Sequence, residues 1–83
     1  MGIEDLSIVF ARSSINPDAW SVNDPTAMER YVLLQEKSSW VVFYAERGIR
    51  NDERWFKTEN EACQYFVKLL ISDQSTSLGV SNG

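Results

Sequence analysis

The sequence predicts a small α+β domain, in which an antiparallel sheet of three or four strands forms a meander and packs with an N-terminal and a C-terminal helix. Residues 40–47 are almost continuously aromatic or β-branched, which is the composition of a buried strand. Residues 58–73 begin with a capping signal and continue with apolar residues at helical spacing. The chain of 83 residues has the size of one domain. Strand runs bounded by helices are typical of the α+β class.

Residues 3–14 are predicted to form the N-terminal helix. Ile3, Leu6 and Phe10 recur at the spacing of one helix face, and two acids lie in what would be the first turn, where they suit the helix dipole. A neighbouring β-branched pair leaves a strand open as the alternative. Pro17 ends the element, because the residue before a proline avoids the helical region.

The next elements are expected to be strands. Residues 19–22 suit a short edge strand, and the turn-forming residues of 23–26 follow it. Residues 29–36 are rich in strand formers, and a short polar loop at 37–39 joins them to the strongest strand signal, residues 40–47. The two runs should pair as an antiparallel hairpin.

The strand at 40–47 is expected to be central in the sheet. Its apolar side chains fall into two alternating sets, with Trp40, Val42 and Tyr44 on one face and Val41, Phe43 and Ala45 on the other. A half-buried antiparallel strand would alternate apolar and polar residues, so this pattern indicates a strand that is covered on both sides.

Gly48 is expected to end the central strand. Residues 49–52 are interpreted as a loop, and residues 53–57 as a third strand that returns beside the second. Trp55 and Phe56 would then point to opposite faces of the sheet.

Residues 58–73 carry the clearest helix signal. Thr58 and Glu61 have the spacing of a capping box, in which the hydroxyl accepts a free N–H and the carboxylate reaches back to the cap. The apolar positions that follow form one stripe, Ala62, Phe66, Leu69 and Leu70, with Cys63 and Val67 beside it. We expect this stripe to dock on the sheet. Residues 1–71 would form the domain, and the Ser- and Gly-rich residues 72–83 a flexible tail.

The composition excludes several kinds of site. The chain has one cysteine and no histidine, so it has neither an internal disulfide, nor the usual thiolate or imidazole zinc sites, nor a histidine base. We expect no cofactor and no metal, and a buried, inert thiol at Cys63. The acidic start does not resemble a signal peptide, and no apolar run approaches the roughly 18 residues of a membrane span. A cytoplasmic protein is therefore expected.

The charge balance favours a basic partner. Twelve acids and eight bases give a net charge of −4. Binding to nucleic acid depends on a basic surface, so direct nucleic-acid binding is not expected.

Residues 44–56 hold two Glu-Arg pairs that raise the question of chemistry. Glu46 and Glu53 could face each other across adjoining strands and share acid–base work. Each has an arginine beside it, however, and charges near a loop usually face water. Three arginines in this stretch could hold a phosphate, but the neighbouring acids cancel most of their field. We therefore predict a protein that is not an enzyme and that acts by binding.

A set of short motifs in residues 29–70 resembles a known group of proteins. The motifs are a strand ending in Leu-x-x-Glu at 33–36, Trp-x-Val-x-Tyr at 40–44, Glu-Arg-Gly at 46–48, a phenylalanine at 56 and Thr-Glu-x-Glu-Ala-Cys-x-Tyr-Phe at 58–66. Together they resemble small bacterial immunity proteins encoded beside polymorphic and contact-dependent growth inhibition toxins. The resemblance covers about half of the chain. Residues 23–28 and the C-terminal tail have no counterpart in it.

The resemblance implies a single-domain cytosolic protein that binds and neutralises the toxin domain encoded by the neighbouring gene, with no catalytic residues. Nuclease toxins are basic because they hold nucleic acid, so an acidic partner could plug the active-site cleft and associate rapidly. An RNase, such as a tRNase, is the first expectation for the toxin and a DNase the second. The immunity protein itself is expected to be a monomer.

The toxin-facing residues are sought among exposed acids and amphipathic aromatics. Such side chains can complement a basic surface or anchor an interface. The candidates are Asp24, Glu36, Tyr44, Glu46, Asp52, Glu53 and Trp55. The alternative function is a non-catalytic adaptor or regulatory module, which could form a homodimer through an exposed strand edge.

Overall fold

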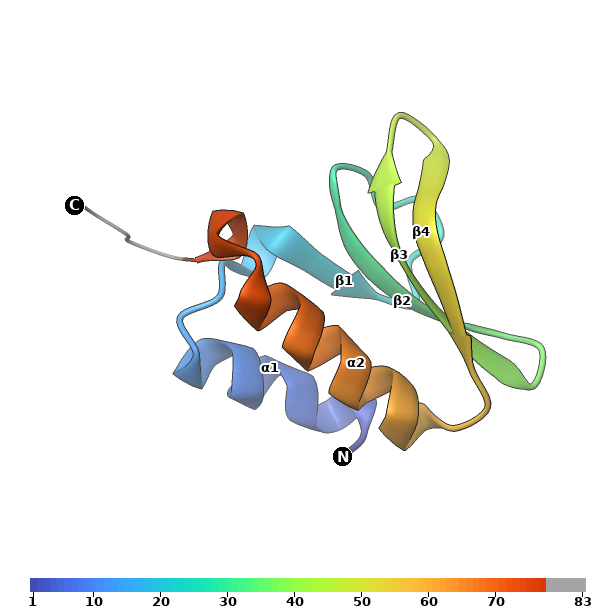
Figure 1. Ribbon diagram of the computed structural model, residues 1–83, viewed down its shortest axis with the longest axis horizontal. Coiled ribbons are helices and arrows are strands. Elements are labelled where there is room, and N and C mark those ends of the chain that lie inside the picture. Colours follow the sequence, from blue (N-terminus) through green and yellow to red (C-terminus); the bar gives the residue numbers. More distant parts are fainter. Residues whose placement is uncertain (78–83) are drawn as a thin grey trace.

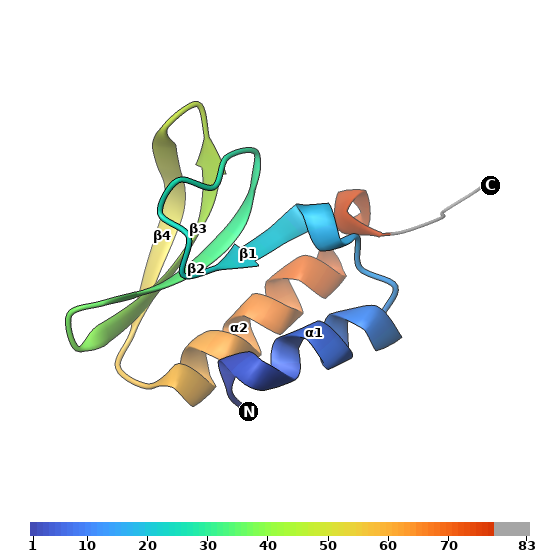
Figure 2. The same ribbon diagram turned by 180° about the vertical axis from the view of Figure 1, so that it is seen from behind.

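The computed structural model describes residues 1–77 and arranges them as a sheet with helices on one side (Figure 1). The elements of this part of the chain are α1 (Ile3–Arg12), η1 (Pro17–Ala19), β1 (Trp20–Val22), β2 (Arg30–Glu36), β3 (Ser39–Glu46), β4 (Ile49–Phe56), α2 (Glu59–Ser72) and η2 (Gln74–Thr76). Figures 1 and 2 show α1 and α2 side by side on the same face of the sheet. The predicted α+β class, with a helix at each end of the chain, is confirmed.

The sheet is mixed and not wholly antiparallel as predicted. Its order is β1-β2-β3-β4, and β2, β3 and β4 form the expected antiparallel meander. β1, however, pairs with β2 in the parallel direction. Parallel neighbours need a crossover connection, and residues 23–29 supply it by crossing the sheet face opposite the helices, which we call the outer face (Figure 2). Two backbone bonds hold the ends of this crossover, from Asn23 N–H to the Leu33 carbonyl at 2.8 Å and from Glu29 N–H to the Ala45 carbonyl at 2.7 Å.

β4 is longer than predicted, because the turn before it is tight. Arg47 and Gly48 have φ values of 53° and 78°, and they form a two-residue connection between the paired residues Glu46 and Ile49. Positive φ at both central positions gives a turn whose twist matches that of the strands. Residues 49–52, interpreted from the sequence as a loop, therefore belong to the strand. Their polar side chains are tolerated because β4 lies at the edge of the sheet and is largely exposed.

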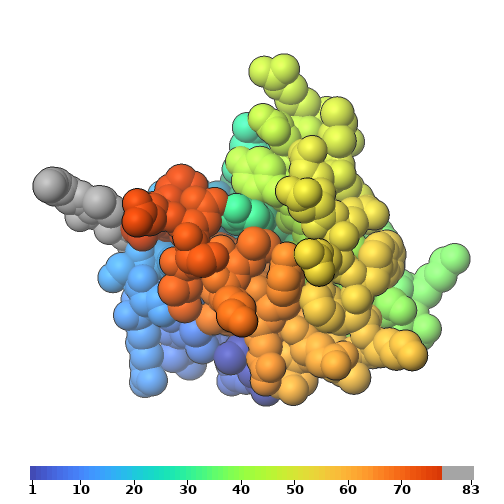
Figure 3. Space-filling view, in the orientation of Figure 1, coloured from blue at the N-terminus to red at the C-terminus, as the bar shows by residue number. Residues whose placement is uncertain are grey.

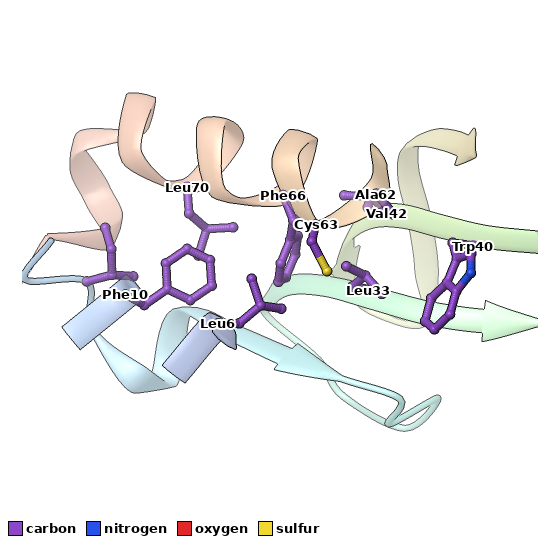
Figure 4. Packing of buried hydrophobic residues seen from close by; sticks show 10 residues of the cluster. Leu6, Phe10, Leu33, Trp40, Val42, Ala62, Cys63, Phe66 and Leu70 are labelled. Carbon is purple, nitrogen blue, oxygen red and sulfur yellow. The ribbon is translucent and has the colours of Figure 1, made fainter. Parts of the chain in front are cut away.

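The main core lies between the helices and the sheet (Figure 4). Its buried members come from both helices, from the segment after α1 and from the two middle strands, namely Leu6, Phe10, Ile15, Leu33, Trp40, Val42, Ala62, Cys63, Phe66 and Leu70. The rings of Phe10 and Phe66 meet edge to face, with centroids 5.8 Å apart. The apolar stripes predicted for α1 and α2 are thus confirmed as the faces that these helices bury.

A second apolar cluster lies on the outer face. Its buried members alternate with those of the main core along β2 and β3, namely Val32, Leu34, Val41, Phe43 and Ala45. Ala27, from the crossover, packs against them. The prediction of a central strand covered on both sides is therefore confirmed for β3, and the second cover is a loop.

The C-terminal end of α2 continues into ordered structure. Residues 72–77, expected to belong to a flexible tail, instead complete α2 and form η2. The side chain of Thr76 is only 2% exposed. Its hydroxyl donates to the Leu70 carbonyl at 2.7 Å, and its own carbonyl accepts from Asn16 N–H, also at 2.7 Å. Polar residues pack here because the turn satisfies their hydrogen bonds; the rest of the expected tail, residues 78–83, lies outside the described part of the chain.

Candidate functional site

A groove of about 730 Å³ lies between the β3–β4 hairpin and the C-terminal half of α2. We call it the sheet–helix groove. Figure 3 shows the hollow between the orange-red end of α2 with η2 and the yellow-green hairpin. Its walls come from these elements and from β2, with Tyr31, Phe43, Tyr44, Glu46, Asn51, Asp52, Glu53, Arg54, Tyr65, Leu69, Asp73 and Ser75.

Two tyrosines form the part of the groove wall that comes from the middle strands of the sheet, β2 and β3. Tyr31 and Tyr44 are directly paired across β2 and β3, so their side chains lie on the same face. Their rings meet edge to face at a centroid distance of 4.9 Å. Both side chains are half-buried. They provide rigid, amphipathic contact area at one end of the groove.

The hydrogen bond between Tyr31 and Asp73 fixes one side of the groove. The Tyr31 hydroxyl donates to Asp73 Oδ2 at 2.5 Å and so ties β2 to the residue after α2. Asp73 also caps η2, because its Oδ1 accepts from the backbone N–H and the hydroxyl of Ser75 at 3.0 and 2.8 Å. The same aspartate therefore shapes the end of the helix and holds the tyrosine.

At neutral pH the Tyr31 phenol is neutral and the Asp73 carboxylate is charged. Burial, followed by the hydrogen bond and charge of Asp73, raises the pKa of Tyr31 to about 12. The hydrogen bonds from Tyr31 and Ser75 lower the pKa of Asp73 below its usual range. The phenol thus remains a donor and the carboxylate remains ionised.

Tyr44 lies where the groove meets a second hollow. This smaller hollow, of about 200 Å³, shares Tyr31, Tyr44 and Ser75 with the groove. Within residues 1–77 the Tyr44 hydroxyl has no hydrogen-bond partner. Burial raises the pKa of Tyr44, and the charges of Glu29, Glu46 and Asp73 add to this effect. Three carboxylates therefore lie in the surroundings of this hydroxyl.

The groove and the second hollow have more acids than bases. The acids are Glu46, Asp52, Glu53 and Asp73 in the groove and Asp18 and Glu29 in the second hollow; the bases are Arg54 and Arg30. The Arg54 guanidinium lies over the Tyr65 ring at 5.9 Å, and Arg30 donates to the Met28 carbonyl. Within the described chain, both ion pairs involve Arg50, so these two bases do not neutralise the acids directly.

A β-bulge brings two of the acids to the groove. Val42 pairs with Arg54 and Tyr44 with Asn51, so Phe43 is opposed by both Asp52 and Glu53. Asp52 adopts a φ of 57°, the left-handed conformation that a bulge uses and that Asp tolerates better than most residues. The extra residue increases the local twist and changes the direction of the side chains.

The structure brings together only some of the residues proposed from the sequence. The groove contains Tyr44, Glu46, Asp52 and Glu53. Trp55 lies on the outer face, paired with Val41, and is 51% exposed. Asp24 sits in the crossover, where its Oδ1 accepts from the backbone N–H and the hydroxyl of Thr26.

Glu36 is engaged in a network with Arg50. The Arg50 guanidinium contacts the two carboxylate oxygens of Glu36 at 2.7 and 3.1 Å and Glu53 at 3.3 Å. It also lies 4.6 Å above the centroid of the Phe43 ring. The hydrogen bond from Arg50 lowers the pKa of Glu36. The two-pronged contact between Arg50 and Glu36 favours a structural role for Glu36. The second ion pair of Arg50 makes Glu53 the groove acid that already has a basic partner.

The other residues that line the groove are not among the toxin-facing candidates that the sequence suggested. They are Tyr31, Phe43, Asn51, Arg54, Tyr65, Leu69, Asp73 and Ser75. Asp73 and Ser75 were assigned to the tail, although an aspartate two residues before a serine is a local capping signal. Tyr31 could have been found from the hairpin register, which places it opposite Tyr44.

The remaining candidate for chemistry is the thiol of Cys63. It is fully buried in the main core, and burial raises its pKa to about 11. A thiol in this state is inert. Residues 1–77 contain no group of three or more His, Cys, Asp and Glu side chains placed to hold a metal ion. No helix formed by these residues is long and apolar enough to cross a membrane.

Comparisons of the chain with models of known protein families, with curated proteins and with solved structures found no match in any of the three.

Proposed function

We propose that this protein is an immunity protein that binds a cognate toxin domain in the sheet–helix groove and neutralises it by stoichiometric contact. The observation that supports the binding site is a concave surface that has tyrosines in its walls and four acids, of which only Glu53 forms an ion pair within the described residues. The motifs of residues 29–70 support the immunity role, because they resemble those of small immunity proteins.

The chemistry of the groove favours binding over catalysis. Its Tyr31 hydroxyl has a pKa of about 12, so it does not serve as a base or nucleophile at neutral pH. Hydrogen bonds from Tyr31 and Ser75 hold the pKa of Asp73 below its usual range, which is the opposite of the raised pKa that a general acid needs. Rigid aromatics beside unpaired acids are instead suited to a basic protein surface.

A basic toxin domain fits both the groove and the net charge of −4. Nucleases hold nucleic acid with basic clefts, and an acidic protein that occupies such a cleft competes with the substrate. Opposite charges also speed association, which is useful when free toxin is lethal. We propose an RNase, with a tRNase as the first case, and a DNase as the second.

The test is rescue of cells by co-expression with the toxin domain that the resemblance predicts in the neighbouring gene. The wild-type chain is expected to restore growth, and the purified pair is expected to form a complex of equal stoichiometry. Failure to rescue and to bind that domain would remove the immunity function.

Charge reversal tests whether the groove is the binding surface. Glu46→Arg is expected to weaken toxin binding at least tenfold and to make it less sensitive to salt, because it places a base among acids that face a basic partner. Glu4→Arg makes the same charge change on α1, outside the groove, and serves as the matched control. Titration calorimetry at two salt concentrations measures both effects. Equal losses in the two variants would place the toxin elsewhere.

The alternative is an adaptor that self-associates through β4. This edge strand leaves Ile49 and Trp55 61% and 51% exposed. Exposed edge strands are templates for pairing with another chain. Sedimentation velocity distinguishes the two: a tight dimer without a toxin partner favours the adaptor, and a monomer that binds toxin favours immunity.

A further inference from the structure

We propose that the junction of the sheet–helix groove and the second hollow, at the Tyr44 hydroxyl, receives an arginine side chain of the partner. The inference rests on the proposed function for the identity of the partner. It adds the chemical group that the site recognises.

The junction gathers acidic side chains from both hollows. Asp73 already accepts from Tyr31 and Ser75, whereas no hydrogen bond within residues 1–77 reaches the carboxylates of Glu29 and Glu46. The oxygen of Tyr44 is unpaired within residues 1–77, and the carboxylates of Glu29, Glu46 and Asp73 are close enough to perturb this phenol. These carboxylates come from three different parts of the fold, namely the crossover, the end of β3 and the residue after α2. A guanidinium carries only donors, arranged as a planar fork, and so complements such a set.

The aromatic walls favour arginine over lysine. Guanidinium groups stack on aromatic faces, whereas the ammonium of lysine is a compact and strongly hydrated charge. The chain itself uses this contact once at the groove, with Arg54 over Tyr65, and once on the outer face, with Arg50 over Phe43. The edge-to-face pair of Tyr31 and Tyr44 offers a further aromatic surface beside the unpaired carboxylates.

The size of the second hollow suits one side chain. Its volume of about 200 Å³ is below the roughly 300–1,000 Å³ of small-molecule sites. The groove that adjoins it is larger and can hold the segment that carries the arginine. Arg30 and Arg54 line the two hollows, but each already has a contact within the chain: Nε of Arg30 donates to the Met28 carbonyl, and Arg54 lies over the Tyr65 ring.

The proposal is tested with a small probe in place of the toxin. The isotope-labelled full chain is titrated with N-acetyl-arginine methylamide and followed by two-dimensional NMR of the backbone amides. Saturable shifts are expected at Tyr31, Tyr44, Glu46 and Asp73. The lysine analogue is expected to bind several-fold more weakly, and the citrulline analogue, which keeps the shape and removes the charge, should give no saturable shift.

Substitutions locate the contact. Glu46→Gln is expected to reduce the affinity for the arginine probe about tenfold, which corresponds to one charge-assisted hydrogen bond. Tyr44→Phe keeps the ring and removes the unpaired hydroxyl, so a smaller reduction of about threefold is expected. Glu4→Gln, on α1, removes one charge away from the groove and should leave the affinity unchanged.

The proposal is overturned if the arginine and citrulline analogues bind alike, or if the shifts lie outside the groove. These results are independent of the rescue experiment. Rescue by a chain that does not bind the arginine probe would remove this contact and leave the immunity function intact. If the chain binds the arginine probe but neutralises no toxin, the immunity function is removed and the arginine contact remains.

Discussion

Single residues hold the groove in shape, and Tyr31 is the clearest of them. Its hydroxyl joins β2 to Asp73 across 42 positions of the sequence. Tyr65 provides a comparison within the same groove, since its hydroxyl has no hydrogen-bond partner within the described residues and its ring packs against Phe56. Two tyrosines that line the same groove, from β2 and from α2, thus differ in whether the hydroxyl group makes a hydrogen bond.

This difference predicts the effect of removing each hydroxyl. Tyr31→Phe is expected to lower the free energy of unfolding by about 1 kcal/mol, because a hydrogen bond to a charged acceptor is lost and water replaces it at the half-exposed Asp73. Tyr65→Phe should change it by less than about 0.5 kcal/mol. Urea unfolding of both variants measures the two values. Equal losses would mean that the Tyr31–Asp73 bond does not stabilise the fold.

At the scale of elements, the β3–β4 hairpin carries most of the groove acids on a conformationally demanding backbone. Arg47 takes the first position of its two-residue turn with φ at 53°, although it has a Cβ that disfavours this region. Asp52 at the bulge is also left-handed, with φ at 57°. The bulge and the charged side chains of this edge strand also discourage pairing with other chains, as is common at sheet edges.

The turn predicts a stabilising substitution. Arg47→Asn is expected to raise the free energy of unfolding by about 0.5–1 kcal/mol, because Asn tolerates left-handed φ and Asn-Gly is the preferred pair in such turns. Arg47→Ala removes the same charge and keeps the conformational strain, so it should give no gain. The comparison is made by urea unfolding. A similar gain in both variants would attribute the effect to charge and not to the turn.

For the whole molecule, patterns carried by apolar residues predicted the fold well. The apolar stripes of α1 and α2 follow the helical period of 3.6 residues, and the two-sided burial of β3 follows the strand period of 2. These periods can be read from the sequence because burial requires apolar residues along the whole element. The direction of β1 could not be read in this way, since a strand of only three residues has the same pattern in either direction.

The groove was less predictable, because it is made by contacts between distant segments. Glu46 and Asp52 could be proposed from the composition of one short stretch, and both line the groove. Asp73 could not, because its role arises only when η2 folds back and Tyr31 lies within reach. Local propensity made residues 49–52 look like a loop, and the tight turn at Arg47–Gly48 overrode it. The proposed binding site therefore includes positions that local patterns describe least.

The excess of acids in the groove is expected to lower the free energy of unfolding of the protein when no partner is bound. Carboxylates that lack basic partners repel each other, and the net charge of −4 adds to this repulsion. Glu46→Gln is therefore expected to raise the urea midpoint of the free chain slightly at low salt, and added salt should remove the difference by screening. Glu4→Gln, in the first turn of α1, removes an acid that favours the helix dipole and should lower the midpoint. If Glu46→Gln were destabilising at low salt, the acids of the groove would be supporting the fold, and binding would not be the reason for their placement.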